Sequence, residues 1–246
     1  MKKLQPFSYE EYANIIHWIR ANYDICKFND ITTDSDNFCL IRHDVEFSVD
    51  RALQLAELEN ALGVPSTYLF QLRNNVYNSL SVQNIYKIRK IKDLGHDIGL
   101  HVHCGMLDEY SDIKDMIRTD IDSLSKITGI DVQVFSFHRP TTNLLMSDIQ
   151  IDGLINAYGN LYFHAYDSDA PKKLNVKYIA DSNHSWKYGY PMHVSHSRLQ
   201  INFHPFSWTN NGYENVSNFK ELLAEKITEL TNSISSEIKT FPLELL

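Results

Sequence analysis

Short apolar runs and segments with helical spacing alternate along most of this chain. Each strand-like run ends in polar residues, and a segment with apolar residues at helical spacing follows most of them. The expected strands cover residues 38–41, 66–72, 97–103 and 132–137, and two later apolar runs end at Asp181 and His204. The expected helices cover residues 8–22, 49–62, 81–94, 107–128 and 215–234. This alternation predicts βαβ units and a parallel sheet.

Local signals set several of the helix ends. Ser8 and Glu11 have the spacing of a capping box, which favours a helix start at residue 8. Gly63 and Gly95 follow two of the helical patterns and are typical of helix ends. The last segment, 215–234, is amphipathic, whereas residues 141–198 carry the least regular pattern.

Composition and charge exclude several classes of protein. The 246 residues are 43% hydrophobic and 22% charged, which is typical of a globular chain, and we expect one domain over residues 1–246. The net charge of -8 and the lack of a basic stripe argue against nucleic acid as a partner. No signal-peptide core or apolar run of membrane-spanning length occurs. A cytoplasmic protein is therefore expected.

Two carboxylates follow the first apolar run. Asp44 and Glu46 are two residues apart, so in an extended chain both point to the same face. Acids that share a face repel one another unless a cation neutralises them, and a divalent metal can leave one of them free to act as a base. An ordinary surface loop is the alternative for this cluster taken alone.

Two imidazoles come at the end of the third expected strand. His101 and His103 are also two residues apart, a spacing that can chelate one metal ion. Two histidines and a carboxylate suit zinc, iron, cobalt or nickel and leave positions open for water and substrate. The three cysteines include no CxxC pair and do not predict a thiolate zinc site.

The remaining candidates lie near later strand ends. Arg139 can hold a carboxylate through two hydrogen bonds, and His204 can protonate a leaving amine. Asp181 can orient His204, and Trp186 can stack on a sugar ring, although core packing is the commoner use of Trp. We expect contacts with substrate from four residues: Arg42, His138, Asp181 and Trp186.

The order and spacing of these motifs resemble the polysaccharide deacetylase superfamily, also called carbohydrate esterase family four. The motifs are IRHDVE, GHDIGLHVH, FSFHRP, ADS and NFHP, within residues 38–208. The resemblance implies a distorted (β/α) barrel of about seven parallel strands, one divalent metal and hydrolysis of an N-acyl group. It also assigns roles: Asp44 as catalytic base, Glu46 as metal-binding acid, His101 as first metal histidine, Arg139 as the holder of the base and His204 as the acid.

The chain departs from the family pattern at two positions. The usual second metal histidine lies four residues after the first, where this chain has Gly105, and position 46 is Glu instead of Asp. We therefore assign His103 as the third ligand from local geometry alone. His138 and His164 are the next candidates.

These residues predict a zinc-dependent hydrolase that removes an acetyl or formyl group from a sugar. The absence of an export signal favours a soluble N-acylated or nucleotide-linked sugar as substrate, and family analogy places the reaction in surface polysaccharide biosynthesis. Two alternatives stay open. One is a metal-dependent hydrolase of a non-sugar amide, and the other is a non-catalytic homologue that binds carbohydrate.

Overall fold

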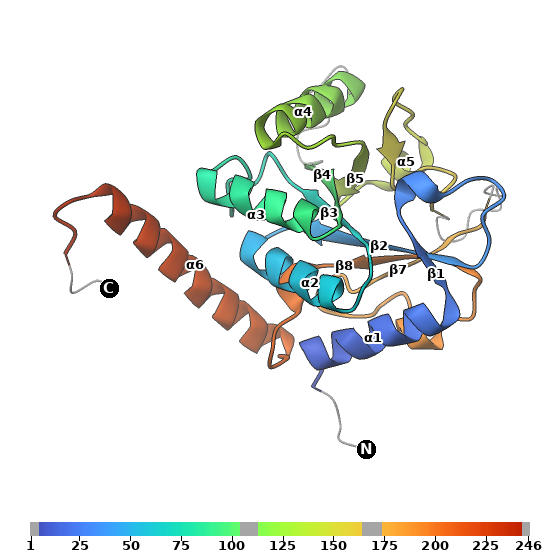
Figure 1. The fold of residues 1–246 in the computed structure, drawn as a ribbon, viewed down its shortest axis with the longest axis horizontal. Coiled ribbons are helices and arrows are strands. Elements are labelled where there is room, and N and C mark those ends of the chain that lie inside the picture. Colours follow the sequence, from blue (N-terminus) through green and yellow to red (C-terminus); the bar gives the residue numbers. More distant parts are fainter. Residues whose placement is uncertain (1–4, 104–112, 164–173, 243–246) are drawn as a thin grey trace.

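The computed structural model describes residues 5–103, 113–163 and 174–242, which form helices around a parallel sheet (Figure 1). The α-helices are α1 (Tyr9–Asn22), α2 (Val49–Ala61), α3 (Val82–Asp93), α4 (Ile113–Thr128), α5 (Thr142–Met146) and α6 (Asn215–Glu237). The strands are β1 (Asp24–Cys26), β2 (Phe38–Val45), β3 (Thr67–Phe70), β4 (Asp97–His103), β5 (Val134–His138), β6 (Ile155–Asn156), β7 (Lys177–Ala180) and β8 (Arg198–Phe203).

The sheet follows the order β6-β5-β4-β3-β2-β8-β7, and all its strand pairs are parallel. Strand β1 lies off this path and pairs with the start of β2. In the described part of the chain the sheet is curled and stays open between β6 and β7. The fold is therefore a distorted (β/α) barrel with seven strands along its path, which confirms the predicted fold class.

Helix starts follow from capping side chains. The Ser8 hydroxyl accepts a hydrogen bond from the backbone N–H of Glu11, and Ser48 and Ser81 cap α2 and α3 in the same way. Such a cap typically stabilises a helix by about 1 kcal/mol. These caps confirm the predicted starts of the first three helices to within one residue.

Strand β2 differs from its prediction because it is longer. The strand was expected to end at Ile41, but it continues to Val45 and is buried along its whole length. Its even-numbered residues face the inside of the curled sheet: Phe38 and Leu40 belong to an apolar cluster there, and Arg42 and Asp44 follow. The inside of the barrel is thus apolar near the strand starts and polar near the strand ends.

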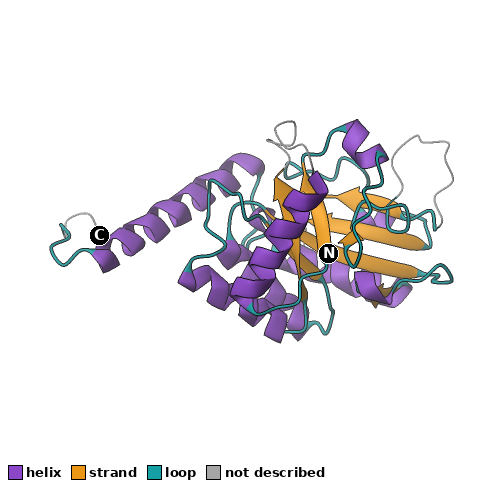
Figure 2. Cartoon of the chain, turned by 90° about the horizontal axis from the view of Figure 1, so that it is seen from above, coloured by secondary structure: helices purple, strands orange, loops and turns teal. Residues whose placement is uncertain are grey.

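The outer face of the sheet is covered by helices (Figure 2). Helices α2, α3 and α4 pack on the outward residues of β3, β4 and β5, and α1 packs on β2 and β8. Inside, the strands approach closely at Gly99, where an added Cβ would lie 2.5 Å from Leu69 Cδ2 and 2.7 Å from the Val134 carbonyl oxygen. Even an alanine at this position would push β3 and β5 away from β4.

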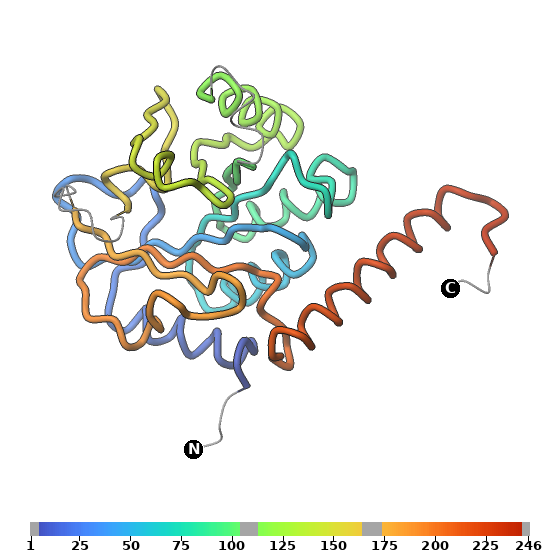
Figure 3. Tube along the Cα trace, turned by 180° about the vertical axis from the view of Figure 1, so that it is seen from behind, coloured from blue at the N-terminus to red at the C-terminus, as the bar shows by residue number. Residues whose placement is uncertain are grey.

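Helix α6 behaves differently from the other helices. It leaves the body of the protein near its own first turns and extends away from it (Figures 1 and 3). Within the described ranges, no helix has both the length and the apolar content needed to cross a bilayer.

Candidate active site

The carboxyl ends of β2, β4, β5 and β8 surround a cleft of about 550 Å³. In parallel sheets these ends lie at one edge, where loops can carry functional groups. Six of the predicted residues line the cleft: Asp44, Glu46, His101, His138, Arg139 and His204. The structure thus brings together at one strand edge the residues of four motifs that lie far apart in the sequence.

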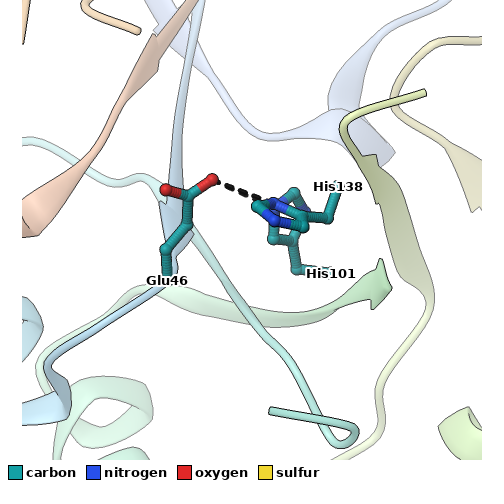
Figure 4. A group of neighbouring side chains, drawn as sticks. All are labelled: Glu46, His101 and His138. Atoms are coloured by element: carbon teal, nitrogen blue, oxygen red, sulfur yellow. Dashed lines mark ion pairs between the residues drawn. The ribbon is translucent and has the colours of Figure 1, made fainter. Parts of the chain in front are cut away.

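Three side chains converge in this cleft as a candidate metal centre: Glu46, His101 and His138 (Figure 4). Each offers one ligand atom, and these atoms all lie within 4.8 Å of one another. Glu46 Oε1 lies 2.9 Å from His138 Nδ1 and 4.0 Å from His101 Nε2. Ligands at zinc distances of about 2.1 Å are roughly 3.4 Å apart in a tetrahedral site, so small side-chain movements complete the geometry.

The hydrogen bonds of His101 leave one of its nitrogens available. Ser136 Oγ lies 2.8 Å from His101 Nδ1 and donates a hydrogen bond to Asp44 Oδ1 at 3.3 Å. When the Ser136 proton is directed to Asp44, which can only accept, Nδ1 of His101 donates to Ser136. The other nitrogen, Nε2, is buried without a hydrogen-bond partner. An unpartnered imidazole nitrogen beside a carboxylate fits a metal ion.

Glu46 supplies the negative charge of this group. Burial by itself would raise the pKa of its carboxyl, but His101, His138 and His204 together hold this pKa far below its usual value. Glu46 is thus a carboxylate at neutral pH. An anionic ligand beside two imidazoles is the donor set expected for zinc or another borderline divalent metal.

The third member of this group is His138 instead of His103. His103 pairs with His138 across β4 and β5, and their ring centroids are 5.4 Å apart. His138 is the one turned toward Glu46, where it occupies the place that the sequence assigned to His103. His138 was expected to contact substrate, and His164, the other alternative ligand, lies outside the described residues.

Asp44 is held by an arginine, but not by the predicted one. Arg42 Nη2 donates to Asp44 Oδ2 at 3.0 Å, and Asn202 Nδ2 donates to the same oxygen at 2.8 Å. Arg139, which was predicted to hold the base, is exposed at the cleft rim, and none of the ion pairs between described residues includes it. The reason is strand geometry: Arg42 and Asp44 are on the same face of β2, whereas Arg139 follows the end of β5.

This arrangement also corrects the role expected for Arg42. Its side chain is fully buried and stacks over the Tyr158 ring, with its guanidinium carbon 4.4 Å from the ring centroid, so it does not face the cleft. Burial alone would raise the pKa of Asp44, but Arg42 and then His101 and His204 lower it. Asp44 is therefore an ionised carboxylate with a fixed orientation.

His204 and Asp181 form a buried pair. Asp181 Oδ1 lies 2.6 Å from His204 Nδ1, and Asp181 Oδ2 accepts a hydrogen bond from Trp208 Nε1 at 2.7 Å. Burial would lower the pKa of His204, but the hydrogen bond and charge of Asp181, with Glu46 and Asp44, raise it to about 9. His204 is therefore an imidazolium at neutral pH. Asp181 is fully buried and orients His204, so its expected contact with substrate is not found.

Trp186 was expected to stack on a sugar, but it packs in the core instead. Its ring contacts Phe203 and Trp208 in the cluster beside α1, and it is not among the residues lining the cleft. Other aromatic residues do border the cleft. They are Phe47, Phe137, Tyr158, Phe163, Tyr178, Tyr188, Phe206 and Phe219.

Sequence reasoning missed several polar residues that support the site. Ser136, Gln200 and Asn202 are almost fully buried and bond Asp44 or Arg42. A signal for them exists in the sequence. Each lies two residues from another polar residue within an apolar strand, and such alternation indicates a polar inner face.

No family model matches this sequence, and neither does any curated protein. Solved structures of family 4 carbohydrate esterases resemble this chain. The sequence motifs resemble the same family. One is a family 4 carbohydrate esterase from Bacillus anthracis, with 12% identity, coverage of 87% of this chain and 85% of that one, and a TM-score of 0.45.

Two further structures show the range of these matches. The chitin deacetylase of the fungal pathogen Colletotrichum lindemuthianum has 15% identity, covering 78% of this chain and 84% of its own, with a TM-score of 0.41. A family 4 pseudoenzyme from Bacillus anthracis has 14% identity, covering 83% of this chain and 66% of its own, with a TM-score of 0.42.

Proposed function

We propose that this protein is a metal-dependent amide hydrolase that removes an acetyl or formyl group from an N-acylated sugar or activated sugar precursor. One observation carries the proposal. A His-His-Glu group, an ionised aspartate and an imidazolium face the same cleft, as hydrolysis of an amide requires. These are the groups needed to activate water, to accept its proton and to protonate the leaving nitrogen.

Glu46, His101 and His138 would hold the metal ion. A bound divalent ion lowers the pKa of water and polarises the acyl oxygen. The buried, unpartnered Nε2 of His101 supports this assignment, because leaving a buried polar nitrogen without a partner costs about 1–3 kcal/mol unless something binds it. Ser136 fixes the ring so that this nitrogen stays directed toward Glu46.

Asp44 and His204 divide the proton transfers. Asp44 accepts a proton from the attacking water, and its clamp by Arg42 and Asn202 keeps one oxygen fixed during that transfer. His204 donates a proton to the amide nitrogen as the carbon–nitrogen bond breaks, which yields a carboxylic acid and a free amine. Its Nε2 lies 3.8 Å from Glu46 Oε1, beside the proposed metal ligands, and Asp44 lines the same cleft.

The dimensions of the cleft suit a small substrate. Its volume of about 550 Å³ is within the usual range for small-molecule sites. Phe47, Phe206 and Phe219 contact one another along one wall and offer apolar area, while Asn183 and Arg139 offer polar groups at the rim. A sugar presents both kinds of surface, which supports a monosaccharide or nucleotide-linked sugar.

The test is turnover of a small panel by protein loaded separately with zinc, cobalt and nickel. The panel contains N-acetylated and N-formylated sugars, their nucleotide-linked forms, a ureide and a cyclic amide, and free amine and released acid are both measured. We expect metal-dependent release of acid from at least one sugar, and a release at least about 100-fold slower after Asp44→Asn.

The same experiment separates the alternatives. Turnover of the ureide or cyclic amide alone would assign the same site to a non-sugar amide. A metal-loaded protein that binds the sugars but releases neither acid nor amine would be a carbohydrate-binding homologue, and the hydrolase proposal would fail.

A further inference from the structure

The outer face of α6 exposes an apolar stripe. The stripe consists of five residues: Val216, Leu223, Ile227, Leu230 and Ile234. Their exposed fractions range from 42% to 67%, and Ile227 is the most exposed. Monomeric proteins rarely expose contiguous apolar patches larger than a few hundred Å² unless another surface covers them.

The stripe lies opposite the face that anchors α6 to the body. Asn218 and Leu222 are buried on the anchoring face, and Arg51 of α2 bonds Asn218 and Glu225 at 2.7–2.9 Å. At 3.6 residues per turn, Leu223 and Ile227 point away from this contact. The stripe is therefore unrelated to how the helix is held in its own chain.

The spacing of the stripe is that of a coiled-coil seam. Positions 216, 220, 223, 227, 230 and 234 are separated by four and three residues in turn, and all except Lys220 are apolar. A repeat of 3.5 residues keeps one seam of a helix facing another helix. A flat apolar partner, such as a lipid surface, does not require this alternation.

We propose that the stripe binds the α6 helix of a second copy of this chain in antiparallel orientation. Charge complementarity carries the choice of partner and direction. When two α6 helices are paired antiparallel about residues 228 and 229, Leu223 faces Ile234 and Ile227 faces Leu230 of the second copy. Lys220 then faces Glu237. In a parallel pair Lys220 would face Lys220 of the second copy and Glu237 would face Glu237, and both like-charge contacts are unfavourable.

The position of α6 leaves room for this partner. The helix extends away from the body (Figures 1 and 3), so two chains paired in this way carry their bodies at opposite ends of the helix pair. The 23 residues of α6 span about 35 Å, enough for two layers of apolar contacts and the Lys220–Glu237 pair on each side of the two-fold axis.

The first experiment is sedimentation velocity of the full chain over a range of concentrations, for the wild type and for Ile227→Glu. We expect a dimer for the wild type and self-association weaker by about a hundredfold or more for the variant, because each dimer loses two buried isoleucines. Asn232→Glu places the same charge on the opposite side of α6 and should leave the dimer intact. Circular dichroism checks that each variant folds.

A wild type that stays monomeric at every concentration overturns the proposal. If that monomer floats with phospholipid vesicles, the stripe belongs to a lipid surface instead. A dimer that Ile227→Glu does not weaken also overturns the proposal, because its interface must then lie elsewhere.

The second experiment tests the orientation by exchanging charges. Lys220→Glu and Glu237→Lys should each weaken the dimer several-fold, and the two changes in one chain should restore it, since opposite charges then face each other again. If neither single change weakens the dimer, the helices are not antiparallel in this register.

Discussion

Glu46 and Glu59 lie on opposite sides of the sheet and have different surroundings. Glu59 belongs to α2, points toward the outer face of the sheet and is fully buried. Its oxygens accept hydrogen bonds from Tyr12, Ser66 and Tyr68 at 2.5–2.8 Å, and His43 Nε2 lies 2.9 Å away. Three hydroxyl groups therefore donate to this carboxylate, and they come from different segments of the chain.

Glu46 also lies beside histidines, but its group is incomplete. Its side chain remains 15% exposed to the cleft, its imidazole partners lie 2.9–4.0 Å away, and Nε2 of His101 has no hydrogen-bond partner. The Glu59 carboxylate is surrounded by hydrogen-bond donors, and we expect it to stabilise the fold. The Glu46 carboxylate lies beside imidazoles that are not hydrogen-bonded to one another, and we expect this group to bind a ligand.

The largest effect that we expect is on catalysis at the incomplete centre. Asp44→Asn removes the proposed proton acceptor while keeping the side-chain shape, so kcat should fall by about 10²–10⁴-fold. Steady-state kinetics on the substrate found in the panel measures this, with metal content as the control. A variant that keeps full turnover would show that Asp44 is not the base.

Metal binding separates His138 from His103. His138→Ala should lose stoichiometric metal, whereas His103→Ala should keep it, because only His138 faces Glu46. Elemental analysis of both variants after removal of any affinity tag measures this. Loss of metal in His103→Ala together with retention in His138→Ala would restore the ligand set expected from the sequence.

At Glu59 the expected effect is on the stability of the fold. The pKa of Glu59 is lowered from 4.5 to about 2, because His43, His96 and Tyr12 outweigh the effect of burial. A lowered pKa contributes stability that is present above pH 4.5 and is lost as the pH falls toward 2, about 3 kcal/mol in all.

Glu59→Gln tests this contribution. At pH 7 its free energy of unfolding, measured by urea denaturation, should be about 3 kcal/mol lower than that of the wild type. The difference should shrink as the pH falls below 4.5. Metal content of the folded variant should not change, and if it did, the two centres would not be independent.

The smallest effects distinguish two serines, one beside each centre: Ser136 contacts His101, and Ser66 contacts Glu59. Ser136→Ala removes the partner of His101 and should weaken metal affinity about 10-fold, as loss of a hydrogen bond to a metal ligand usually does. Ser66→Ala removes a donor to Glu59 and should lower stability without changing metal affinity. Metal titration and denaturation of both variants check this. Equal effects on metal affinity would contradict the comparison.

The fold was largely predictable because its signals are local. Strand β4 begins and ends where its pattern predicted, and the caps at Ser8 and Ser81 mark true helix starts. The prediction failed where polar residues are buried. Arg42 and Asp44 continue β2 as a buried ion pair. A local pattern cannot show whether a charged residue is paired with a neighbour or solvated by water.

The candidate site was predictable in outline for the same reason. Strand ends bring Asp44, Glu46, His101 and His204 together, as their positions indicated. The choice between His103 and His138 depends on which ring turns inward across a strand pair, and that is decided by packing. Trp186 shows the same limit, since a tryptophan near a site has the same sequence signal whether it faces the cleft or the core.

The location of Arg42 and Asp44 on one strand has a consequence for protein engineering. Asp44, the proposed base, and Arg42, which aligns it, belong to a single rigid element, so their geometry does not depend on the rim. Rim residues such as Arg139 and Tyr188 can therefore be exchanged to change which molecule enters the cleft, with no need to realign Asp44. Substrate choice and chemical competence can be optimised separately in this scaffold.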